Sequence, residues 1–502
     1  MHIVHIASEL APVAKVGGLG DVLYGLSKEL VSKKQKVEII IPKYDCIDYK
    51  QLKHLKVDLQ EMLCTEGSEQ IRNTIWSCEL ENLRVLLIES HDPTHYFGRE
   101  KIYGCDDDVE RFTYFCRAAL EYLFQTKRTP DLIHLHDWPT ALIAPLYKEV
   151  YKPLGLKAQG IVLTIHNLDY QGKCLPKQIS RVGLRGENPL IREKMQDPSI
   201  FGTINLLKGG IEYADQVTTV SPTYMREIMT PLAGAGLQEV VVANRNKMRG
   251  ILNGIDENYW NPEKDPFLIK RYNTFNVGEQ DKLQKVLEAK KENRRQLRIH
   301  FGLREGDYPI VGSVTRLVTQ KGPELILHAM TRTLKRGGQF TLLGSDHGSK
   351  IEKEFLPWNG REKSIGISID KNEALCHLIF AGSDLLIVPS LFEPCGLTQM
   401  IALRYGTVPV VRRTGGLADT VFDIDTSDRP ESERNGYTFD HFDAAGMNWA
   451  LDRALDCWEN DRAKWNRIIM NGMRYNFSWE KSARAYLDLY TALISRDKKR
   501  AA

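Results

Sequence analysis

Short runs of β-branched and aliphatic residues alternate with longer amphipathic stretches along most of this chain. In the first half, the runs predicted as strands are residues 3–7, 37–41, 85–88, 132–135, 161–165 and 217–220. Amphipathic patterns predict helices between them, most clearly over residues 21–34, 110–124 and 204–214. Buried strands that alternate with such helices form parallel sheets covered on both faces, so this half predicts an α/β domain.

The same rhythm restarts in the second half, with strands predicted at residues 310–314, 340–343, 385–388 and 408–411. Between residues 220 and 309 it is broken by Asn253-Gly254, Asn261-Pro262 and a charged helical stretch over residues 285–298. A chain of 502 residues also exceeds one ordinary core. We therefore expect two doubly wound, Rossmann-like domains, residues 1–247 and 248–478, facing each other across a deep cleft. Residues 479–502 are expected to form a C-terminal helix that can return to the first domain.

Composition narrows the class of protein. A net charge of +3 gives no support for nucleic-acid binding, and no apolar run approaches the roughly 20 residues that a membrane span needs. Nine scattered cysteines without a Cys-x-x-Cys pair fit reduced thiols, and the N-terminus has no secretory signal pattern. We expect a cytoplasmic protein without nucleic-acid or membrane partners, and its oligomeric state stays open.

A glycine-rich segment, Lys15-Val16-Gly17-Gly18-Leu19-Gly20-Asp21, lies between the first predicted strand and helix. Backbone N–H groups and a helix N-terminus in such a turn can converge on an anion, and Lys15 adds a positive charge. The Gly-Lys-Ser/Thr of a Walker loop is absent, and so is the third glycine of the dinucleotide fingerprint. The segment thus predicts a phosphate-bearing ligand, while a tight turn without a ligand stays open.

Two segments of the second half carry comparable chemistry. Arg316 and Lys321 flank the end of a predicted strand, and two fixed cations suit a diphosphate leaving group. After the strand at 385–388, Glu393 precedes a turn whose N–H groups open the next helix; the carboxylate suits sugar hydroxyls and the N–H groups suit a phosphate. Exposed basic residues and an ordinary helix N-terminal charge are the alternatives.

Histidines end two strands of the first half, in His134-Leu135-His136-Asp137-Trp138 and Thr164-Ile165-His166-Asn167. A zinc or two-metal hydrolase can show such a pattern, but no ligand set is complete, and His134 lies within an apolar run that favours the core. We expect no metal, and we expect Asp137, His166 and Trp138 to serve as polar and stacking groups for a sugar. The Asp-x-Asp pairs at residues 106–108 and 423–425 are expected to be solvated.

Taken in order, these segments resemble the bacterial glycogen synthases and plant starch synthases, glycosyltransferases of family 5 with the GT-B fold, over nearly the whole chain. The motifs that carry the resemblance are Lys15-Val16-Gly17-Gly18-Leu19-Gly20-Asp21, His136-Asp137-Trp138, Thr164-Ile165-His166-Asn167-Leu168-x-Tyr170-Gln171-Gly172, Val220-Ser221-Pro222-Thr223-Tyr224, Leu252-Asn253-Gly254-Ile255-Asp256, Ser313-x-x-Arg316-Leu317-x-x-Gln320-Lys321-Gly322, Pro389-Ser390-x-x-Glu393-Pro394-Cys395-Gly396-Leu397-Thr398-Gln399 and Thr414-Gly415-Gly416-Leu417-Ala418-Asp419-Thr420. The resemblance implies transfer of glucose from ADP-glucose to the non-reducing-end 4-hydroxyl of an α-1,4-glucan such as glycogen. The anomeric configuration is retained, and no cofactor takes part.

The resemblance also implies roles for single residues, grouped by what they hold. The diphosphate is expected to contact three cations and assisting groups around them: Lys15, Arg316, Lys321, Gly18 and the N–H groups that follow Cys395, in Gly396, Leu397 and Thr398. Three side chains are expected to position the glucosyl unit: Glu393, His166 and Asp137. Asp21 is expected nearby, and Asn253 is counted with the donor-binding residues. Fixed cations can neutralise a departing diphosphate without a metal.

The sequence departs from the family pattern at three places. Val16 replaces the usual Thr, and Leu343-Gly344-Ser345-Asp346-His347 replaces the usual Leu-Gly-x-Gly-Asp. Lys371 falls where bacterial members usually carry a Tyr against the nucleotide base. UDP-glucose therefore stays open as the donor. A glucan-binding protein without turnover, and a GT-B enzyme with another acceptor, are the rival functions.

Overall fold

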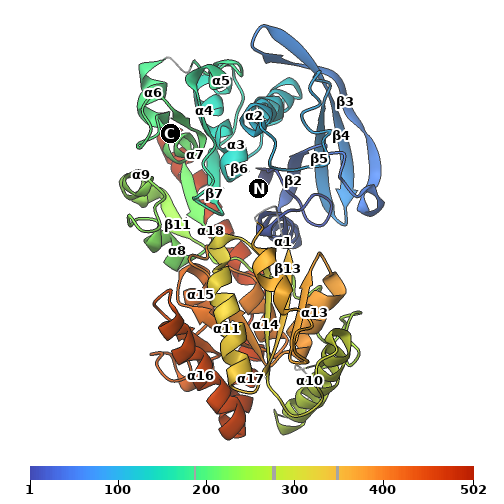
Figure 1. Ribbon diagram of the computed structural model, residues 1–502. Helices are drawn as coiled ribbons and strands as arrows, with labels where there is room; N and C mark the ends of the chain where they lie inside the picture. The colour runs from blue at the N-terminus through green and yellow to red at the C-terminus, as the bar shows by residue number, and fades with distance from the viewer. Residues whose placement is uncertain (186–187, 274–278, 346–349, 502) are drawn as a thin grey trace. The chain divides into compact units, whose positions relative to one another are not determined.

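The computed structural model describes residues 1–185, 188–273, 279–345 and 350–501, and the chain divides into two compact units (Figure 1). The first unit is Met1–Gly254 with Trp479–Ala502, and the second is Ile255–Ser478. The boundary differs from the one expected after residue 247, because Met248–Gly250 forms strand β11, which pairs with β10 in the first unit's sheet. The C-terminal helix α18 (Trp479–Ala501) belongs to the first unit.

The first unit is built on a nine-stranded sheet in the order β11-β10-β7-β6-β1-β2-β5-β4-β3. Its strands are β1 (His2–Ile6), β2 (Lys36–Pro42), β3 (Lys53–Glu66), β4 (Glu69–Leu80), β5 (Leu83–Ser90), β6 (Leu132–His136), β7 (Gly160–Ile165), β10 (Gln216–Thr219) and β11. The strands predicted from the apolar runs are all present, with ends within two residues of the prediction.

The expectation of wholly parallel sheets is wrong at one edge of this sheet. Strands β3 and β4 form an antiparallel hairpin, and β4 also pairs antiparallel with β5, as Figure 1 shows. Most of β3 is exposed, with only three buried positions near its end. Charged residues therefore interrupt its apolar pattern, which is why the search for buried runs passed over it.

Helices cover both faces of the first sheet. The helices of this unit are α1 (Gly18–Ser32), α2 (Asp108–Gln125), α3 (Trp138–Ala141), α4 (Ile143–Leu146), α5 (Pro176–Ser180), α6 (Pro189–Met195), α7 (Leu206–Tyr213), α8 (Pro222–Glu227), α9 (Gln238–Ala243) and α18. Helix α18 packs on α1 so closely that a Cβ on Gly25 would lie 1.9 Å from Trp479 Nε1. The helix predicted from residue 204 starts at Leu206 instead, because Asn205 caps it by accepting a hydrogen bond from the Lys208 N–H.

The second unit contains a fully parallel six-stranded sheet in the order β14-β13-β12-β15-β16-β17. Its strands are β12 (Ile310–Arg316), β13 (Gln339–Ser345), β14 (Ile365–Ile369), β15 (Leu385–Val388), β16 (Val408–Arg412) and β17 (Tyr437–Phe439). Its helices are α10 (Glu279–Phe301), α11 (Pro323–Lys335), α12 (Glu352–Phe355), α13 (Glu373–Gly382), α14 (Thr398–Arg404), α15 (Gly415–Thr420), α16 (Ala444–Asn460) and α17 (Arg462–Arg474). Strands β14 and β17 were not predicted.

Strand order places the candidate residues in both sheets. The order reverses between β1 and β6 in the first unit and between β12 and β15 in the second. In open α/β sheets ligands bind beyond the carboxyl ends of the strands at such a switch point. The segments that hold Lys15 and Asp137 follow β1 and β6, and those that hold Lys321 and Glu393 follow β12 and β15.

Two expectations from composition can be compared with the structure. No two of the nine cysteines form a disulfide. Among the described residues, no helix is both long enough and apolar enough to cross a membrane.

Candidate functional site

The loop after β1 carries an ion pair at its glycine-rich end. Lys15 Nζ lies 2.8 Å from Asp21 Oδ1, with 43% and 36% of the two side chains exposed. Partial burial raises the pKa of Asp21, and the Lys15 ammonium opposes this rise. Lys15 is thus anchored to the first turn of α1 while a large part of its side chain stays open.

The backbone of this loop is held by a residue that the sequence analysis did not select. The N–H groups of Val16 and Gly17 donate to Glu9 Oε2 at 2.7 and 2.8 Å, and Glu9 is 3% exposed. The prediction that the N–H groups of the turn converge on an anion is therefore wrong for these two, because a carboxylate of the protein already accepts them. Glu9 is the only Asp, Glu, Lys or Arg in the apolar segment from residue 3 to 14, a signal that could have identified it.

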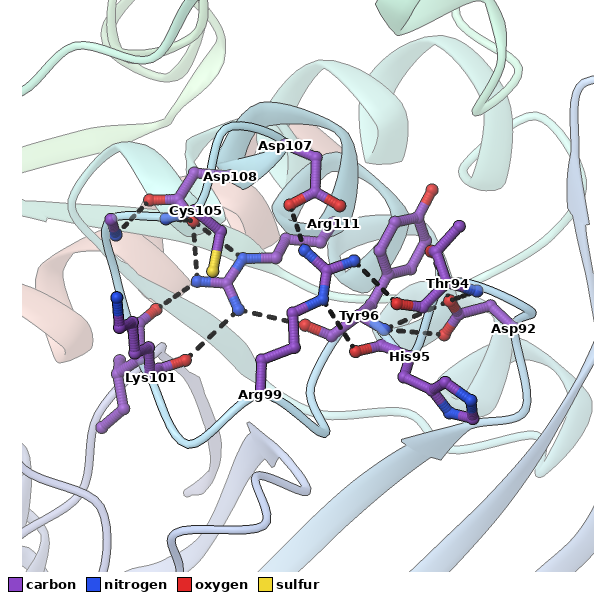
Figure 2. A network of polar contacts seen from close by, with 12 residues as sticks. Asp92, Thr94, His95, Tyr96, Arg99, Lys101, Cys105, Asp107, Asp108 and Arg111 are labelled. Carbon is purple, nitrogen blue, oxygen red and sulfur yellow. Dashed lines mark hydrogen bonds and ion pairs between the residues drawn. The ribbon is translucent and has the colours of Figure 1, made fainter.

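Glu9 is itself supported by the loop before α2. The Tyr103 hydroxyl donates to Glu9 Oε1 at 2.8 Å and lies 2.7 Å from Ser8 Oγ. Figure 2 shows how that loop is fixed: the fully buried Arg111 guanidinium donates to Asp108 Oδ1 at 2.9 Å and to the Tyr96 carbonyl oxygen at 3.1 Å. It also donates to the Ile102 carbonyl oxygen at 2.6 Å. The geometry of the glycine-rich loop thus depends on contacts from about a hundred residues further along the chain.

Asp137 follows β6 in a strained backbone conformation, with φ +59° for a residue that is not glycine. Its carboxylate accepts hydrogen bonds from the backbone N–H groups of His166 at 2.7 Å and Asn167 at 3.3 Å. Burial raises the pKa of Asp137 to about 7, although these hydrogen bonds oppose the rise. The contacts join the end of β6 to the end of β7, so Asp137 and His166 are brought together as predicted.

The histidines around these strand ends form a buried cluster. His134 is fully buried, as predicted, and both its ring nitrogens are engaged, with Tyr490 Oη and Thr164 Oγ1, each at 2.7 Å. His136 uses both its ring nitrogens on His5 and His166, at 3.0 and 3.1 Å.

The cluster offers little to a metal ion. Ligand nitrogens of His5, His134 and His136 lie within 4.8 Å of one another, and the rings of His134 and His136 are stacked with centroids 4.4 Å apart. A metal bound by His5, His134 and His136 would have to break the hydrogen bonds that His134 and His136 already make.

In the second unit, Lys321 and Glu393 form a tight ion pair. Lys321 Nζ lies 2.5 Å from Glu393 Oε2, which also accepts a hydrogen bond from Ser390 Oγ at 2.9 Å. Glu393 is only 5% exposed. The two loops are also joined by backbone, because the Leu391 N–H donates to the Gln320 carbonyl at 2.9 Å. The ends of β12 and β15 therefore present an ammonium and a carboxylate in one fixed arrangement.

Close glycine packing fixes the loop that follows Glu393. A Cβ on Gly415 would lie 1.8 Å from the Glu393 carbonyl oxygen, and one on Gly416 would lie 2.1 Å from that of Cys395. Gly396 has φ +73°, a conformation that favours glycine. Leu397 is the N-cap of α14, which starts at Thr398. The structure thus shows why the two-glycine motif at residues 415–416 and the loop at residues 393–398 occur together.

The remaining predicted residues are placed as follows. Arg316 ends β12 and is half-buried, and the described part of the chain shows no ion pair for its guanidinium. Asn253 is buried in the first unit, and its Oδ1 has no hydrogen-bond partner among the described residues. Lys371 is exposed just after β14, and Gly18 is the first residue of α1. Asp346 and His347 lie outside the described residues.

The expectation that both Asp-x-Asp pairs are solvated holds for the exposed Asp106 and is wrong for Asp108 and Asp423. Asp108 is the partner of the buried Arg111. Asp423 is 3% exposed and lies 2.8 Å from Arg453, which also pairs with Asp425 at 2.6 Å. Asp108, Asp423 and Asp425 therefore belong to ion pairs with arginines of the protein, while Asp106 is exposed.

Comparison with known proteins identifies the family. The starch synthase catalytic domain family matches residues 2–243, and the glycosyl transferases group 1 family matches residues 294–470. The chain is 49% identical over 500 residues to a glycogen synthase of Protochlamydia amoebophila, covering 99% of this chain and 100% of that one. The chain belongs to the glycogen and starch synthase family. Another member, a probable starch synthase 4 of Arabidopsis thaliana, is 46% identical over 99% of this chain, which spans 47% of that longer protein.

Solved structures agree with this assignment. The catalytic domain of starch synthase IV from Arabidopsis thaliana, bound to ADP and acarbose, superposes with a TM-score of 0.92 at 46% identity, covering 98% of this chain and 99% of that one. A sucrose-phosphate synthase from Thermosynechococcus elongatus has a TM-score of 0.59 at 18% identity and shows the shared fold alone. The protein is a glycosyltransferase with the GT-B fold, and its family implies a nucleotide-sugar donor and a glucan acceptor.

Proposed function

We propose that this protein extends α-1,4-glucans by transferring glucose from ADP-glucose to the 4-hydroxyl at the non-reducing end, with retention of configuration. Membership of the glycogen and starch synthase family supports the reaction, and the related starch synthase IV domain bound to ADP supports the adenine nucleotide. The observation on this chain that carries the proposal is the pairing of Lys321 with the buried Glu393 at the β12/β15 switch point. It sets a phosphate-binding cation beside a carboxylate able to accept sugar hydroxyls.

In the second unit, Lys321 and Arg316 are proposed to neutralise the diphosphate as negative charge develops on it. Fixed cations in a partly dry site cost no reorganisation at the moment of reaction, so they stabilise the leaving group efficiently. Glu393 is proposed to hold the glucosyl unit, and the N–H groups of Gly396, Leu397 and Thr398 are proposed to bind phosphate oxygens. The ion pair with Lys321 and the hydrogen bond from Ser390 hold the Glu393 carboxylate in place for this task.

In the first unit, Lys15 and Gly18 are proposed to contact the diphosphate, with Asp21 holding Lys15 in place. Asp137 and His166 are proposed to bind hydroxyl groups of the glucosyl unit, and Asn253 is proposed to bind the donor. Asp137 is joined to the His166 backbone, so the two groups act as one rigid unit.

The chemical step forms a bond between the acceptor O4 and the anomeric carbon while the bond from that carbon to the diphosphate oxygen breaks. We propose that the departing phosphate oxygen takes the proton of the acceptor hydroxyl, on the same face of the sugar. We propose that no metal or other cofactor takes part, since Lys15, Arg316 and Lys321 supply the positive charge. Activity should then survive a chelator.

The decisive experiment supplies the purified protein with glycogen and either ADP-glucose or UDP-glucose. Glucose incorporation and release of the nucleoside diphosphate are followed together. Incorporation from ADP-glucose supports the proposal, and a preference for UDP-glucose corrects the donor. Folded protein that incorporates glucose from neither donor would refute it.

A further inference from the structure

Three imidazoles of the first unit form a continuous hydrogen-bonded chain. His5 Nδ1 lies 3.0 Å from His136 Nε2, and His136 Nδ1 lies 3.1 Å from His166 Nε2. His5 comes from β1, His136 from β6, and His166 directly follows β7. His5 and His136 have no exposed surface, and burial lowers the pKa of all three histidines, to about 3 for His5 and His166. All three rings are therefore neutral near neutral pH.

Only two proton arrangements are consistent with this hydrogen-bonded chain of three histidines. A neutral imidazole has one N–H and one lone pair, and each hydrogen bond needs a donor on one side and an acceptor on the other. If His5 donates from Nδ1, then His136 and His166 must also carry their protons on Nδ1. If His166 donates from Nε2, then all three rings carry their protons on Nε2.

The inner end of the chain distinguishes the two arrangements. His5 Nε2 is buried and has no hydrogen-bond partner among the described residues. The neighbouring His134 cannot serve, because its two nitrogens are bonded to Tyr490 and Thr164. Protons on Nε2 would bury an N–H of His5 without an acceptor, whereas protons on Nδ1 leave only a lone pair unused. Buried orphan N–H groups are the rarer defect in native proteins, which favours Nδ1.

We propose that His5 and His136 are positioning residues that fix His166 as the Nδ1–H tautomer, so that His166 donates a hydrogen bond to a hydroxyl oxygen of the glucosyl unit. The inference rests on the proposed contact between His166 and the sugar. It adds two residues, neither of which faces that sugar in the proposal, and it sets the direction of the hydrogen bond. With the opposite tautomer, the outward nitrogen of His166 would be an acceptor only.

The matched variants are His5→Asn, which keeps an amide donor near the position of Nδ1, and His5→Phe, which removes it. His134→Phe is the control, because the His134 ring lies 4.8 Å from that of His5 and is equally buried but lies outside the hydrogen-bonded chain. Thermal unfolding of each variant separates loss of fold from loss of orientation.

The first readout is the tautomer of His166, measured by ¹⁵N NMR of histidine-labelled protein without substrate. We expect the proton on Nδ1 in wild type and in His5→Asn from pH 5 to 8, and a shift of population toward Nε2–H in His5→Phe. A proton on Nε2 in wild type overturns the proposal, as does a His5→Phe spectrum identical to that of His134→Phe. If His5→Phe does not fold, the wild-type tautomer still decides.

The second readout is turnover. His5→Phe should lower kcat by about 10- to 100-fold, the size found when an outer residue that orients a functional histidine is removed. The KM for glucan should change little, and His5→Asn should recover most of the rate. Equal losses in both His5 variants would contradict the proposal. Because the NMR result needs no activity, a failure of the proposed glucosyl transfer is distinguishable from a failure of this inference.

Discussion

The strand ends of the two units hold their carboxylates in different ways. In the first unit, Glu9 and Asp137 each accept hydrogen bonds from two backbone N–H groups, and the other partner of Glu9 is the neutral Tyr103 hydroxyl. In the second unit, Glu393 accepts a lysine ammonium and a serine hydroxyl. A carboxylate bound to amides fixes a loop, whereas a carboxylate bound to an ammonium fixes a cation. The comparison agrees with the proposed roles, in which Asp137 binds sugar hydroxyls and Lys321 neutralises charge on the diphosphate.

Removing the cation of the second unit should have the largest effect. Lys321→Ala is expected to lower kcat by about 10²–10³-fold, because a fixed donor to the leaving group is lost. Its loss also leaves the buried Glu393 carboxylate without its ammonium partner. Steady-state kinetics with ADP-glucose measures the change, and the exposed Lys353→Ala in the same unit is the control. If the Lys321→Ala enzyme keeps a kcat near that of wild type, Lys321 does not neutralise the charge of the leaving group.

Replacing the carboxylate beside His166 should have a smaller effect that depends on pH. Since the pKa of Asp137 is raised to about 7, we expect kcat/KM of wild type to rise between pH 6 and 8 as the carboxylate forms. Asp137→Asn keeps an oxygen for the two N–H groups and is expected to be about 10- to 100-fold slower. A pH profile of the variant that still rises with the same midpoint would exclude Asp137 as the group that titrates.

The same shift predicts a change in stability. In the unfolded chain, Asp137 loses its proton above the ordinary aspartate pKa of about 4, whereas in the folded protein it keeps the proton up to a higher pH. The contribution of this group to the free energy of unfolding therefore falls as pH rises from about 4 to 7, by up to about 1.4 kcal/mol per pH unit. Chemical denaturation should show the free energy of unfolding of Asp137→Asn rising relative to that of wild type between about pH 4 and 7, with no further relative rise above pH 7.

Removing the Glu9 carboxylate that holds the glycine-rich loop should lower the stability of the fold more than it lowers kcat. Glu9→Ala leaves the N–H groups of Val16 and Gly17 without their acceptor and should lower the free energy of unfolding by about 1–3 kcal/mol. Glu9→Gln keeps an oxygen acceptor and can reverse its hydrogen bond with Tyr103, so it should unfold close to wild type. Denaturant titration compares them, and equal losses would show that the negative charge of Glu9 matters more than its hydrogen bonds.

The sequence carried more of the fold than of the site. Strands such as β1 and β7 are buried on both faces and consist mostly of apolar residues, so they could be predicted, whereas the largely exposed β3 could not. Asp137 and His166 were predicted because each directly follows a buried strand, which places both at one sheet edge. Glu9 was not predicted as a site residue because it binds backbone N–H groups, and almost every residue type carries such a group. Tyr103 and Glu9 are 94 residues apart in the sequence, so no local sequence pattern predicts their contact.

The smallest expected effect is on donor preference, when Lys371 of the second unit is replaced. Lys371 is exposed after β14, at the place where the family pattern has a tyrosine. An aromatic ring stacks on adenine with about 0.5–1.5 kcal/mol beyond area burial, so Lys371→Tyr should raise the ratio of kcat/KM for ADP-glucose over UDP-glucose by about 2- to 12-fold. Lys371→Ala removes the ammonium without adding a ring and separates the two contributions. If alanine and tyrosine change the ratio equally, the charge of Lys371, and not the missing stack, sets the donor preference. If neither changes it, the base is read elsewhere in the second unit.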